Sequence, residues 1–411
     1  MPTNHGIAII GAGLAAAKAA EALRLTHGYD GPVTLIGDEA HAPYERPALS
    51  KGYLLGTADA AGLDVHPVGF YRDQDITLLL GETATDLDLE ARRLRTGTGT
   101  DLAFDQVVIA TGARARRLGV PGADLPGVHY LRSRDDSDRL RAALRSAADV
   151  VIVGAGWLGS ELAAAARALG RTTTVIDPLP TPLYAVLGPE IGGLFAQRHR
   201  DHGVDLRCGE SVEALLGADA VEAVRTTTGD TIPADLVIVG IGAIPNTELA
   251  ERAGLKTDSG ILVDADLRTS CPAAFAAGDV ARQRHPRHLN PVRVEHWDNA
   301  IVHGTAAAAS LTGTSAAVDA VPYFFSTQYA STLEYVGHPL RWDRVITRGT
   351  PDSPGFTAFW LDGEVPVAAM TLDNWGAAEH LRALVAAARP VDADRLGDPG
   401  VPLPDLARPA A

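Results

Sequence analysis

Short apolar runs alternate with alanine-rich stretches of helical spacing through the first 240 residues of the chain. Apolar runs of four to six residues bounded by turn residues predict buried strands, and the alanine-rich stretches predict helices. Two strand–helix–strand units are predicted in this way: Gly6–Ile10, Leu14–Leu25 and Pro32–Ile36, then Val150–Val153, Leu158–Leu169 and Thr172–Ile176. Further strands are predicted at Gln106–Ala110 and Leu236–Val239. Strands that alternate with helices predict an α/β protein with parallel sheets.

The pattern changes twice more along the chain. Alternating polar and apolar residues at Arg92–Arg95 and Val221–Thr226 predict inserted antiparallel strands. Glycine and proline gather at Gly119–Gly127 and Gly240–Asn246, which we expect to join domains. After about Val321, two aromatic strands and a helix are predicted: Tyr323–Phe325, Phe356–Leu361 and Ala377–Ala388. This last part predicts a small α+β domain that ends in a proline-rich tail.

Length and charge limit the possible functions. The chain has 411 residues, which suggests two or three domains. Its 36 basic and 51 acidic residues give a net charge of −15, which argues against binding nucleic acid or an anionic membrane. The two cysteines, Cys208 and Cys271, form no disulfide framework, and neither a signal peptide nor a membrane span is expected. We therefore expect a cytoplasmic protein.

A glycine-rich turn joins the first predicted strand to the first predicted helix. Gly11 permits the tight turn, Gly13 lets the backbone approach a pyrophosphate, and the small Ala16 permits close packing of helix and strand. Asp38 follows the second strand, at the spacing of a carboxylate that binds an adenosine ribose. The unit therefore predicts a dinucleotide-binding domain.

The same arrangement recurs in the middle of the chain. Gly154, Gly156 and Gly159 lie between strand and helix, and Asp177 closes the second strand. An acid there accepts a bond from a free ribose 2′-hydroxyl and repels a 2′-phosphate, and no Arg or Lys follows it directly. NADH is therefore favoured over NADPH, unless Asp177 is only a loop acid.

Two dinucleotide sites in one chain favour a flavin nucleotide and a nicotinamide nucleotide that exchange a hydride. A third segment agrees with this hypothesis. Gly278 and Asp279 follow a short predicted strand, where an Asp can bind a ribitol hydroxyl near the pyrophosphate.

With these motifs the chain resembles the flavin-dependent pyridine nucleotide oxidoreductases, in the branch of NADH-dependent ferredoxin reductases of the putidaredoxin reductase type. The resemblance covers nearly the whole chain. It is carried by GAGLAA at Gly11–Ala16, PYERPALSK at Pro43–Lys51, ATGARARRL at Ala110–Leu118, GAGWLGSE at Gly154–Glu161, GIGAIPNTELA at Gly240–Ala250, AAGDVA at Ala276–Ala281 and VEHWDNA at Val294–Ala300. Disulfide reductases carry a cysteine pair near the second of these segments, and this chain has none there.

The resemblance implies a set of site residues. Lys51 is expected near the flavin N5 and paired with Glu161, and these two are the predicted catalytic residues. FAD is expected to contact Ala15, Asp38, Arg46, Lys51, Ala84, Arg132, Asp279 and Trp297. The wider predicted cofactor set adds Gly11, Gly13, Ala16, Ala110, Thr111, Gly112, Gly278, Glu295, His296, Gly154, Gly156, Leu158, Gly159, Asp177 and Gly242. The alternatives are a surface amine for Lys51, an exposed acid for Glu161 and a core aromatic residue for Trp297.

The resemblance also implies the domains: residues 1–112 and 243–320 for FAD, 113–242 for NAD and 321–411 for the C-terminal domain. The implied reaction takes electrons from NADH through FAD to an iron–sulfur ferredoxin that serves a cytochrome P-450 or other oxygenase. An NADH-dependent rubredoxin reductase, another NADH:acceptor flavoprotein and a redox sensor similar to apoptosis-inducing factor remain as alternatives. The family often has Trp-Ser-Asp-Gln where this chain has Phe325, Ser326, Thr327 and Gln328.

An acidic ferredoxin needs a local basic patch on an acidic reductase. Arg284 and Arg287 in the densest basic run, and Arg341 and Arg344 in the third domain, are the candidate docking residues. His285 and His288 lie near Glu295 and His296, but the basic neighbours and loose spacing argue against a metal site. We expect a monomer or weak dimer.

Overall fold

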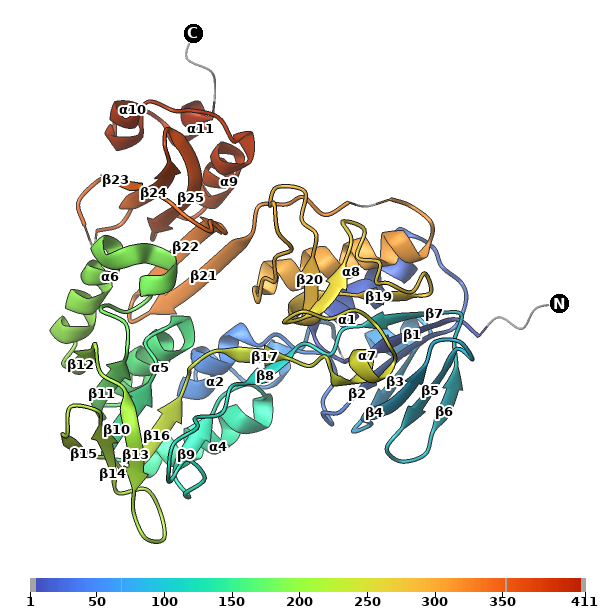
Figure 1. Ribbon diagram of the computed structural model, residues 1–411, viewed down its shortest axis with the longest axis horizontal. Helices are drawn as coiled ribbons and strands as arrows, with labels where there is room; N and C mark the ends of the chain where they lie inside the picture. The colour runs from blue at the N-terminus through green and yellow to red at the C-terminus, as the bar shows by residue number, and fades with distance from the viewer. Residues whose placement is uncertain (1–4, 68, 316, 352, 408–411) are drawn as a thin grey trace. The chain divides into compact units, whose positions relative to one another are not determined.

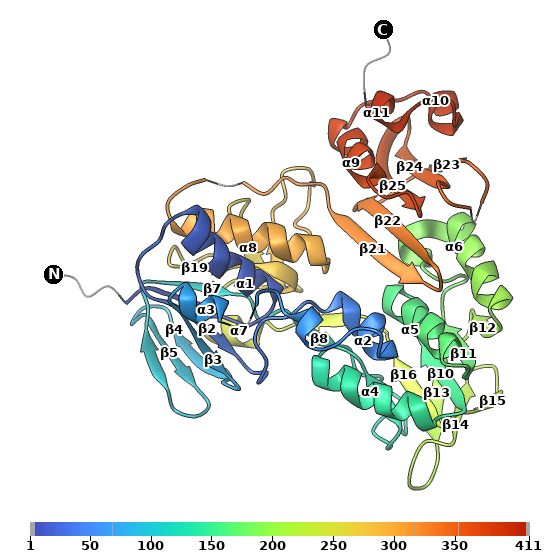
Figure 2. The same cartoon turned by 180° about the vertical axis from the view of Figure 1, so that it is seen from behind.

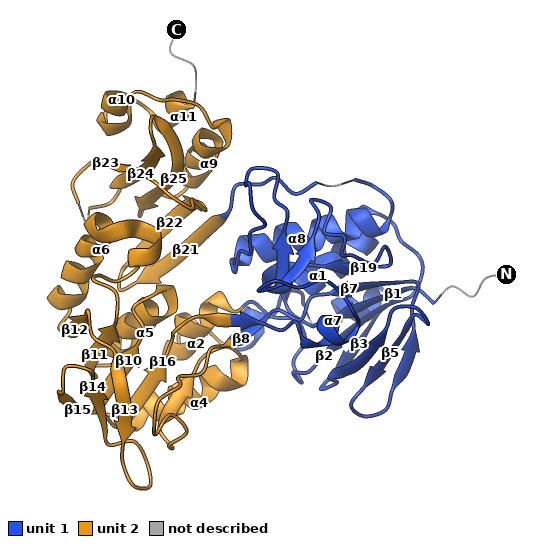
Figure 3. Ribbon diagram, viewed as in Figure 1, with its two compact units in different colours: residues 1–45, 60–114, 244–322 blue, residues 46–59, 115–243, 323–411 orange. Residues whose placement is uncertain are grey.

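The computed structural model describes residues 5–67, 69–315, 317–351 and 353–407 (Figure 1; Figure 2 gives the reverse view). The chain divides into two compact units, which Figure 3 colours separately. Unit 1 consists of Met1–Glu45, Ala60–Arg114 and Ile244–Pro322, and unit 2 consists of Arg46–Asp59, Ala115–Ala243 and Tyr323–Ala411. Both units are therefore discontinuous in sequence.

Unit 1 is built on a five-stranded parallel sheet in the order β19-β7-β1-β2-β3. Its strands are β1 (Ile7–Ile10), β2 (Val33–Gly37), β3 (Ile76–Leu80), β7 (Gln106–Ile109) and β19 (Ala274–Ala276). The central strand β1 is apolar and buried at every position, as expected where both faces of a parallel sheet are covered. Ile10 pairs with Ile36 on one side and Ile109 on the other, so the turns after these strands meet at one edge.

Helices α1 (Leu14–Glu21) and α8 (Trp297–Leu311) pack against each other in unit 1, as Figures 1 and 2 show. Small residues make this close approach possible. A Cβ at Gly304 would lie 2.4 Å from the Ala15 carbonyl oxygen, which only glycine avoids. The predicted helix Leu14–Leu25 is confirmed, although its last turn is a π-helix, η1 (Ala22–Thr26).

The rest of unit 1 consists of short elements around this sheet. They are η3 (Ala61–Leu63), α3 (Phe70–Asp73), the antiparallel strands β4 (Ala84–Asp88), β5 (Arg93–Thr96) and β6 (Asp101–Ala103), α7 (Glu248–Arg252), the parallel pair β18 (Ile261–Val263) and β20 (Ala281–Gln283), and η4 (Gly278–Val280). Strands β8 (Ala113–Ala115) and β17 (Ala243–Pro245) lie where the chain passes between the units.

Unit 2 contains a second five-stranded parallel sheet, in the order β12-β11-β10-β16-β9. Its strands are β9 (Val128–Tyr130), β10 (Asp149–Val153), β11 (Thr172–Asp177), β12 (Val204–Cys208) and β16 (Leu236–Val239). Around it lie α4 (Arg134–Ser146), α5 (Trp157–Ala168), α6 (Tyr184–Asp201) and the antiparallel strands β13 (Val212–Leu216), β14 (Ala223–Thr226) and β15 (Thr231–Pro233). The segment Arg46–Asp59, with η2 (Pro47–Ser50) and α2 (Gly52–Leu55), packs on α4 and α5.

A five-stranded antiparallel sheet, β21-β22-β25-β24-β23, completes unit 2. Its strands are β21 (Tyr323–Gln328), β22 (Ser331–Gly337), β23 (Arg344–Arg348), β24 (Thr357–Asp362) and β25 (Val365–Leu372), with α9 (Ala377–Ala387), α10 (Ala393–Gly397) and α11 (Leu403–Leu406). The core beneath it also takes residues from α6. Trp360 on β24 is fully buried there and donates to the Leu187 carbonyl at 3.1 Å.

The predicted fold class is confirmed: two parallel α/β sheets and a small α+β C-terminal part. One predicted linker differs. Gly119–Gly127 lies within unit 2, where Leu215 N–H donates to the Pro121 carbonyl at 2.9 Å and holds the segment on β13. The nearest passage between the units is at Arg114 instead, whereas the passage at Ala243 lies within the second predicted linker, Gly240–Asn246.

Candidate active site

The first glycine-rich turn joins β1 to α1 in unit 1. Gly11 has φ 122°, and a Cβ there would lie 2.2 Å from the Ala110 carbonyl oxygen, so the chain itself requires glycine. Gly13 differs, because an added Cβ would meet no atom within 4 Å. Gly13 also begins α1, which has no side-chain cap and no acid in its first turn. The uncapped N–H groups and the open space above Gly13 suit a bound phosphate.

The two acids predicted beside this turn differ in their exposure to solvent. Asp38, just after β2, is exposed and accepts no hydrogen bond from a described residue. Asp279 is half-buried on η4. Gly278 beside it has φ 75°, and its added Cβ would lie 3.0 Å from the Ala15 Cβ, so this turn reaches the first turn of α1.

His303 on α8 supports the Gly278 turn and was missed in the sequence. Its Nδ1 accepts the Gly278 N–H at 3.3 Å, and the ring is buried. Burial, with a smaller effect of His285, lowers the pKa of His303 to about 4, so the ring is neutral and can accept this bond. A single histidine in an alanine-rich helix was the only signal available in the sequence.

The remaining predicted residues of unit 1 are half-buried or buried, except for Glu295. Thr111 Oγ1 donates to the Asn246 carbonyl at 2.8 Å, and Asn246 Nδ2 returns a bond to the Thr111 carbonyl at 2.8 Å. Glu295 is the exposed exception, and it pairs with Arg293. The others are Ala15, Ala16, Ala84, Ala110, Gly112, His296 and Trp297, the last two at the N-terminus of α8.

The second glycine-rich turn joins β10 to α5 in unit 2. Gly154 has φ 104°, and its added Cβ would lie 2.4 Å from the Gly240 carbonyl oxygen. At Gly159 the Cβ would lie 1.9 Å from the Gly154 carbonyl oxygen, so helix and turn touch there. Gly156 is exposed, begins α5 without a side-chain cap, and has no atom within 4 Å of an added Cβ. Leu158 is half-buried, and Gly242 has φ 100°.

Asp177 lies beside the second turn and is buried. Its Oδ2 accepts the Ala155 N–H at 2.6 Å, and its Oδ1 accepts the Leu179 N–H at 2.8 Å. The carboxylate therefore holds the glycine-rich turn and the loop after β11 together. Its contact with a ribose stays a prediction.

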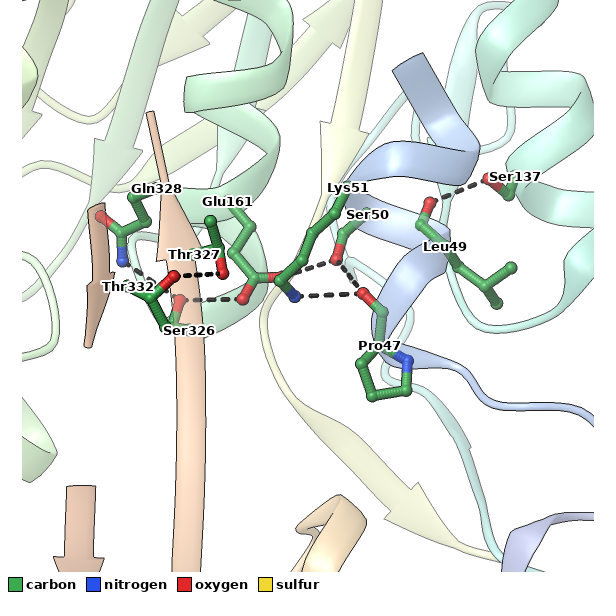
Figure 4. Close-up of polar contacts among 10 residues, drawn as sticks. All are labelled: Pro47, Leu49, Ser50, Lys51, Ser137, Glu161, Ser326, Thr327, Gln328 and Thr332. Carbon is green, nitrogen blue, oxygen red and sulfur yellow. Dashed lines mark hydrogen bonds and ion pairs between the residues drawn. The ribbon is translucent and has the colours of Figure 1, made fainter. Parts of the chain in front are cut away.

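Lys51 and Glu161 form an ion pair in unit 2, with 2.7 Å between Nζ and Oε2 (Figure 4). Lys51 follows η2, and Glu161 lies on α5 two residues after Gly159. The Glu161 side chain is only 6% exposed and that of Lys51 19%. Lys51 Nζ also donates to the Pro47 carbonyl at 3.1 Å, so one of its three donors stays available. Lys51 Nζ lies 5.7 Å from the centre of the Phe325 ring.

Two serines complete the surroundings of Glu161. Ser50 Oγ donates to Oε2 at 2.5 Å, and Ser326 Oγ on β21 donates to Oε1 at 2.8 Å. Both serines are buried. Their motifs were noted in the sequence, but neither serine was predicted to belong to the site, because the approach of β21 to α5 depends on tertiary packing.

Arg46 and Arg132 are brought together in unit 2, where Arg46 Nη1 donates to the Arg132 carbonyl. The predicted FAD residues therefore fall in both units: Arg46, Lys51 and Arg132 in unit 2, and the others in unit 1.

The candidate docking arginines differ in their surroundings. Arg287 donates to Asp319, and Arg341 pairs with Asp362 at 3.0 Å. Arg344 donates to the Gly363 carbonyl at 3.1 Å. Arg284 is exposed and forms no ion pair with a described residue, and Leu289 in the same loop is fully exposed.

His285 and His288 lie near this loop, with 5.1 Å between their ring centres. Burial lowers the pKa of both His285 and His288, and His285 Nε2 lies 3.2 Å from the Ala320 carbonyl oxygen. Within the described ranges, no group of three or more His, Cys, Asp or Glu side chains is placed to hold a metal ion. Among all the residues that the structure describes, no helix combines the length and apolar character needed to cross a bilayer.

Comparison with known proteins identifies two family matches. A family described as pyridine nucleotide-disulphide oxidoreductase matches residues 5–304, and a reductase C-terminal family matches residues 323–407. The predicted resemblance is thereby confirmed.

Curated relatives match over most of their length. The chain is 42% identical to the rhodocoxin reductase of Rhodococcus erythropolis over 87% of this chain and 84% of that protein. It is 40% identical to the ferredoxin–NAD(+) reductase component of the anthranilate 1,2-dioxygenase system of Burkholderia cepacia, over 96% of this chain and 97% of that protein. It is also 35% identical to the rubredoxin-NAD(+) reductase of Ectopseudomonas oleovorans, over 83% of this chain and 88% of that protein.

Among solved structures, the covalent putidaredoxin reductase–putidaredoxin complex resembles this fold throughout. The TM-score is 0.93 at 34% sequence identity, and the alignment covers 98% of this chain and 97% of that one.

Proposed function

The chain belongs to the pyridine nucleotide-disulphide oxidoreductase family, and from this premise we propose that it is an FAD-containing ferredoxin reductase. It is an oxidoreductase, and its expected cofactors, FAD and NAD(H), are those that the family uses. The proposed reaction carries electrons from NADH to an iron–sulfur ferredoxin that serves a cytochrome P-450 or other oxygenase. The ion pair of Lys51 and Glu161 beside an uncapped, glycine-rich helix start is the observation that carries the proposal.

The residues fit two dinucleotides. Gly11 and Gly154 are glycines because the backbone requires them, whereas Gly13 and Gly156 face open space. Each of the latter begins a helix whose N–H groups have no side-chain cap. We assign FAD to the turn at Gly13 and NADH to the turn at Gly156. With this assignment we propose an FAD domain of residues 1–112 and 243–320, an NAD domain of residues 113–242 and a C-terminal domain of residues 321–411.

Lys51 and Glu161 are the proposed catalytic residues. FAD, when bound, accepts a hydride from NADH and can give up its electrons one at a time. The remaining donor of Lys51 can stabilise negative charge beside it. Glu161 holds Lys51 in place and has acceptor capacity left for a nicotinamide amide, since a carboxylate accepts about four hydrogen bonds and three are used.

We propose NADH rather than NADPH as the donor. Asp177 has two acceptor directions left after binding Ala155 and Leu179, so a ribose hydroxyl can still donate to it. The nearby Arg207 is unsuited to clamp a 2′-phosphate, because it pairs with Asp205 at 2.9 Å and Asp230 at 2.7 Å.

Arg284 is the strongest of the four candidate docking arginines, because the other three are bonded within the chain. Beside it, the exposed Leu289 offers apolar contact area. Charge reversal at Arg284 and Arg287 is expected to weaken ferredoxin reduction while sparing turnover of NADH with ferricyanide. Equal loss in the two assays would exclude docking at this loop.

The decisive experiment compares acceptors with the purified, FAD-loaded protein. Steady-state oxidation of NADH is measured with 2Fe-2S ferredoxins and with rubredoxin, each followed by reduction of cytochrome c. Rapid turnover with a ferredoxin supports the proposal. Preference for rubredoxin favours the second candidate, which the similarity to a rubredoxin-NAD(+) reductase supports. Slow turnover with every acceptor favours a redox sensor.

We further propose a monomer or weak dimer in the cytoplasm. Cys208 and Cys271 are both free thiols, which suits a reducing compartment.

A further inference from the structure

We propose that Ser326 is a positioning residue for hydride transfer, acting through Glu161. The inference rests on the proposed function and adds to it a residue from the C-terminal region. Ser326 lies on β21, in the part that matches the reductase C-terminal family, whereas Glu161 lies on the helix of the second glycine-rich turn.

The geometry divides the two oxygens of Glu161 between two tasks. Oε2 accepts Lys51 Nζ at 2.7 Å and Ser50 Oγ at 2.5 Å, so this oxygen holds the predicted flavin-side lysine. Among the described residues, Oε1 accepts a hydrogen bond from Ser326 alone, at 2.8 Å. Without Ser326, the carboxylate would be held through one oxygen and could rotate about its terminal torsion, which is broad for glutamate. Ser326 therefore fixes the plane of the carboxylate.

Gln328 directs the Ser326 hydroxyl toward Glu161. Its Nε2 donates to Ser326 Oγ at 3.4 Å, and both side chains are only 1% exposed. A hydroxyl carries one proton. With its oxygen accepting from Gln328, that proton is left for Glu161, as the row of contacts in Figure 4 shows. The bond is charge-assisted and in a buried place, where such bonds are strong.

Thr327 provides a matched control one residue away. Side chains alternate along a strand, so Thr327 lies on the opposite face of β21 from Ser326. Its Oγ1 lies 3.0 Å from Thr332 Oγ1, and it has no bond to Glu161. Thr327→Val therefore removes a hydroxyl from the same strand without touching the carboxylate.

The test uses the FAD-loaded protein and follows reduction of the flavin by saturating NADH in a single turnover. Ser326→Ala is expected to lower the rate constant about tenfold, from the loss of one hydrogen bond to a charged group. Thr327→Val is expected to stay within about twofold of the parent. Ser326→Cys, a weak donor of similar shape, should resemble Ser326→Ala, and Ser326→Thr, which keeps the hydroxyl, should recover most of the rate.

Two further readouts separate positioning from general damage. In a Glu161→Gln background, adding Ser326→Ala is expected to cause no further loss, because the partner that it orients is gone. The midpoint potential of the bound flavin, measured by dye equilibration, is expected to shift in the same direction in Ser326→Ala as in Lys51→Gln. An additive loss in the double variant, or an unshifted potential, overturns the inference.

The outcomes for the wild-type protein distinguish the two proposals. If NADH reduces the parent and Ser326→Ala behaves like Thr327→Val, the positioning role fails and the proposed function stands. If NADH does not reduce the parent, the proposed function fails and the inference fails with it.

Discussion

The two glycine-rich turns have the same topology but differ at the third small position. In unit 1 this position is Ala16, which is buried with its methyl group in place. In unit 2 it is Gly159, where a Cβ would lie 1.9 Å from the Gly154 carbonyl oxygen. The second turn therefore packs more closely on its helix than the first, although the sequence motifs look alike.

The acids beside the turns differ as well. Asp38 in unit 1 is exposed, whereas Asp177 in unit 2 is buried and accepts the Ala155 and Leu179 N–H groups. The same motif thus serves two purposes. Unit 1 leaves its acid exposed, and unit 2 uses its acid to hold the glycine-rich turn and the loop after β11 together.

The largest effect is expected from exchanging the third residues. Gly159→Ala should destabilise unit 2 by about 4 kcal/mol or more, because the methyl group would overlap the Gly154 carbonyl and the backbone would have to shift. Ala16→Gly should cost about 1 kcal/mol, from helix propensity and a lost methyl group. Urea unfolding in excess FAD measures both. Similar losses at the two positions would mean that the turns do not differ in packing.

The second-largest effect is expected from lowering the pH, which should reduce the stability that His303 gives to the first turn. The folded pKa of His303 is about 4, below its ordinary 6.5, so the unfolded chain takes up the proton first as the pH falls. His303 therefore favours the folded state fully above pH 6.5, and about 3 kcal/mol is lost by pH 4. His303→Gln keeps an acceptor that does not titrate. Its stability, followed by urea unfolding across this range, should fall less steeply than that of the parent, and an unchanged slope would contradict the role.

Removing each acid in turn should lower the free energy of unfolding by amounts that differ by about 2 kcal/mol. Asp177→Ala leaves two backbone N–H groups without their acceptor in a buried place, which costs about 2 kcal/mol. Asp38→Ala removes an exposed side chain and should change stability by less than about 0.5 kcal/mol. Thermal unfolding measures the melting temperature of both variants. Equal melting temperatures would contradict the expected difference between Asp177 and Asp38.

The smallest effect concerns cofactor binding. Asp38→Ala should weaken FAD about tenfold, as expected for one lost hydrogen bond, while leaving the Michaelis constant for NADH unchanged. Asp177→Ala should raise that constant for NADH more than for NADPH, since the discriminating charge is removed. FAD release is followed by flavin fluorescence. A protein that already prefers NADPH would contradict the assignment of Asp177.

The sequence was sufficient for the strands and helix starts around the two glycine-rich turns. Strands such as β16 and the starts of α1 and α5 were predicted within one residue, because apolar runs and glycine turns act over a few neighbours. The pairing of Lys51 with Glu161 was implied by the resemblance and lies in the structure at 2.7 Å.

Long-range contacts were not accessible in the same way. The Ser326 bond to Glu161 joins residues 165 positions apart, and no spacing rule connects them. The kink of α6 at Gly188, which has φ 74°, was also missed, although Pro189 was visible. The indole of Trp342 lies against that glycine, from a loop that is remote in sequence.

The discontinuity of unit 1 has a consequence for how the chain is made. Strand β19 pairs with β7, and α8 packs on α1, but both reach the ribosome exit only after residues 115–243. The parallel sheet of unit 2 needs nothing beyond β16 and is complete once Val239 has emerged. During synthesis we therefore expect this later-encoded sheet to fold first, while the N-terminal strands wait for their last partners. A chain truncated before Ala274 should retain the second dinucleotide turn and lack a finished first one.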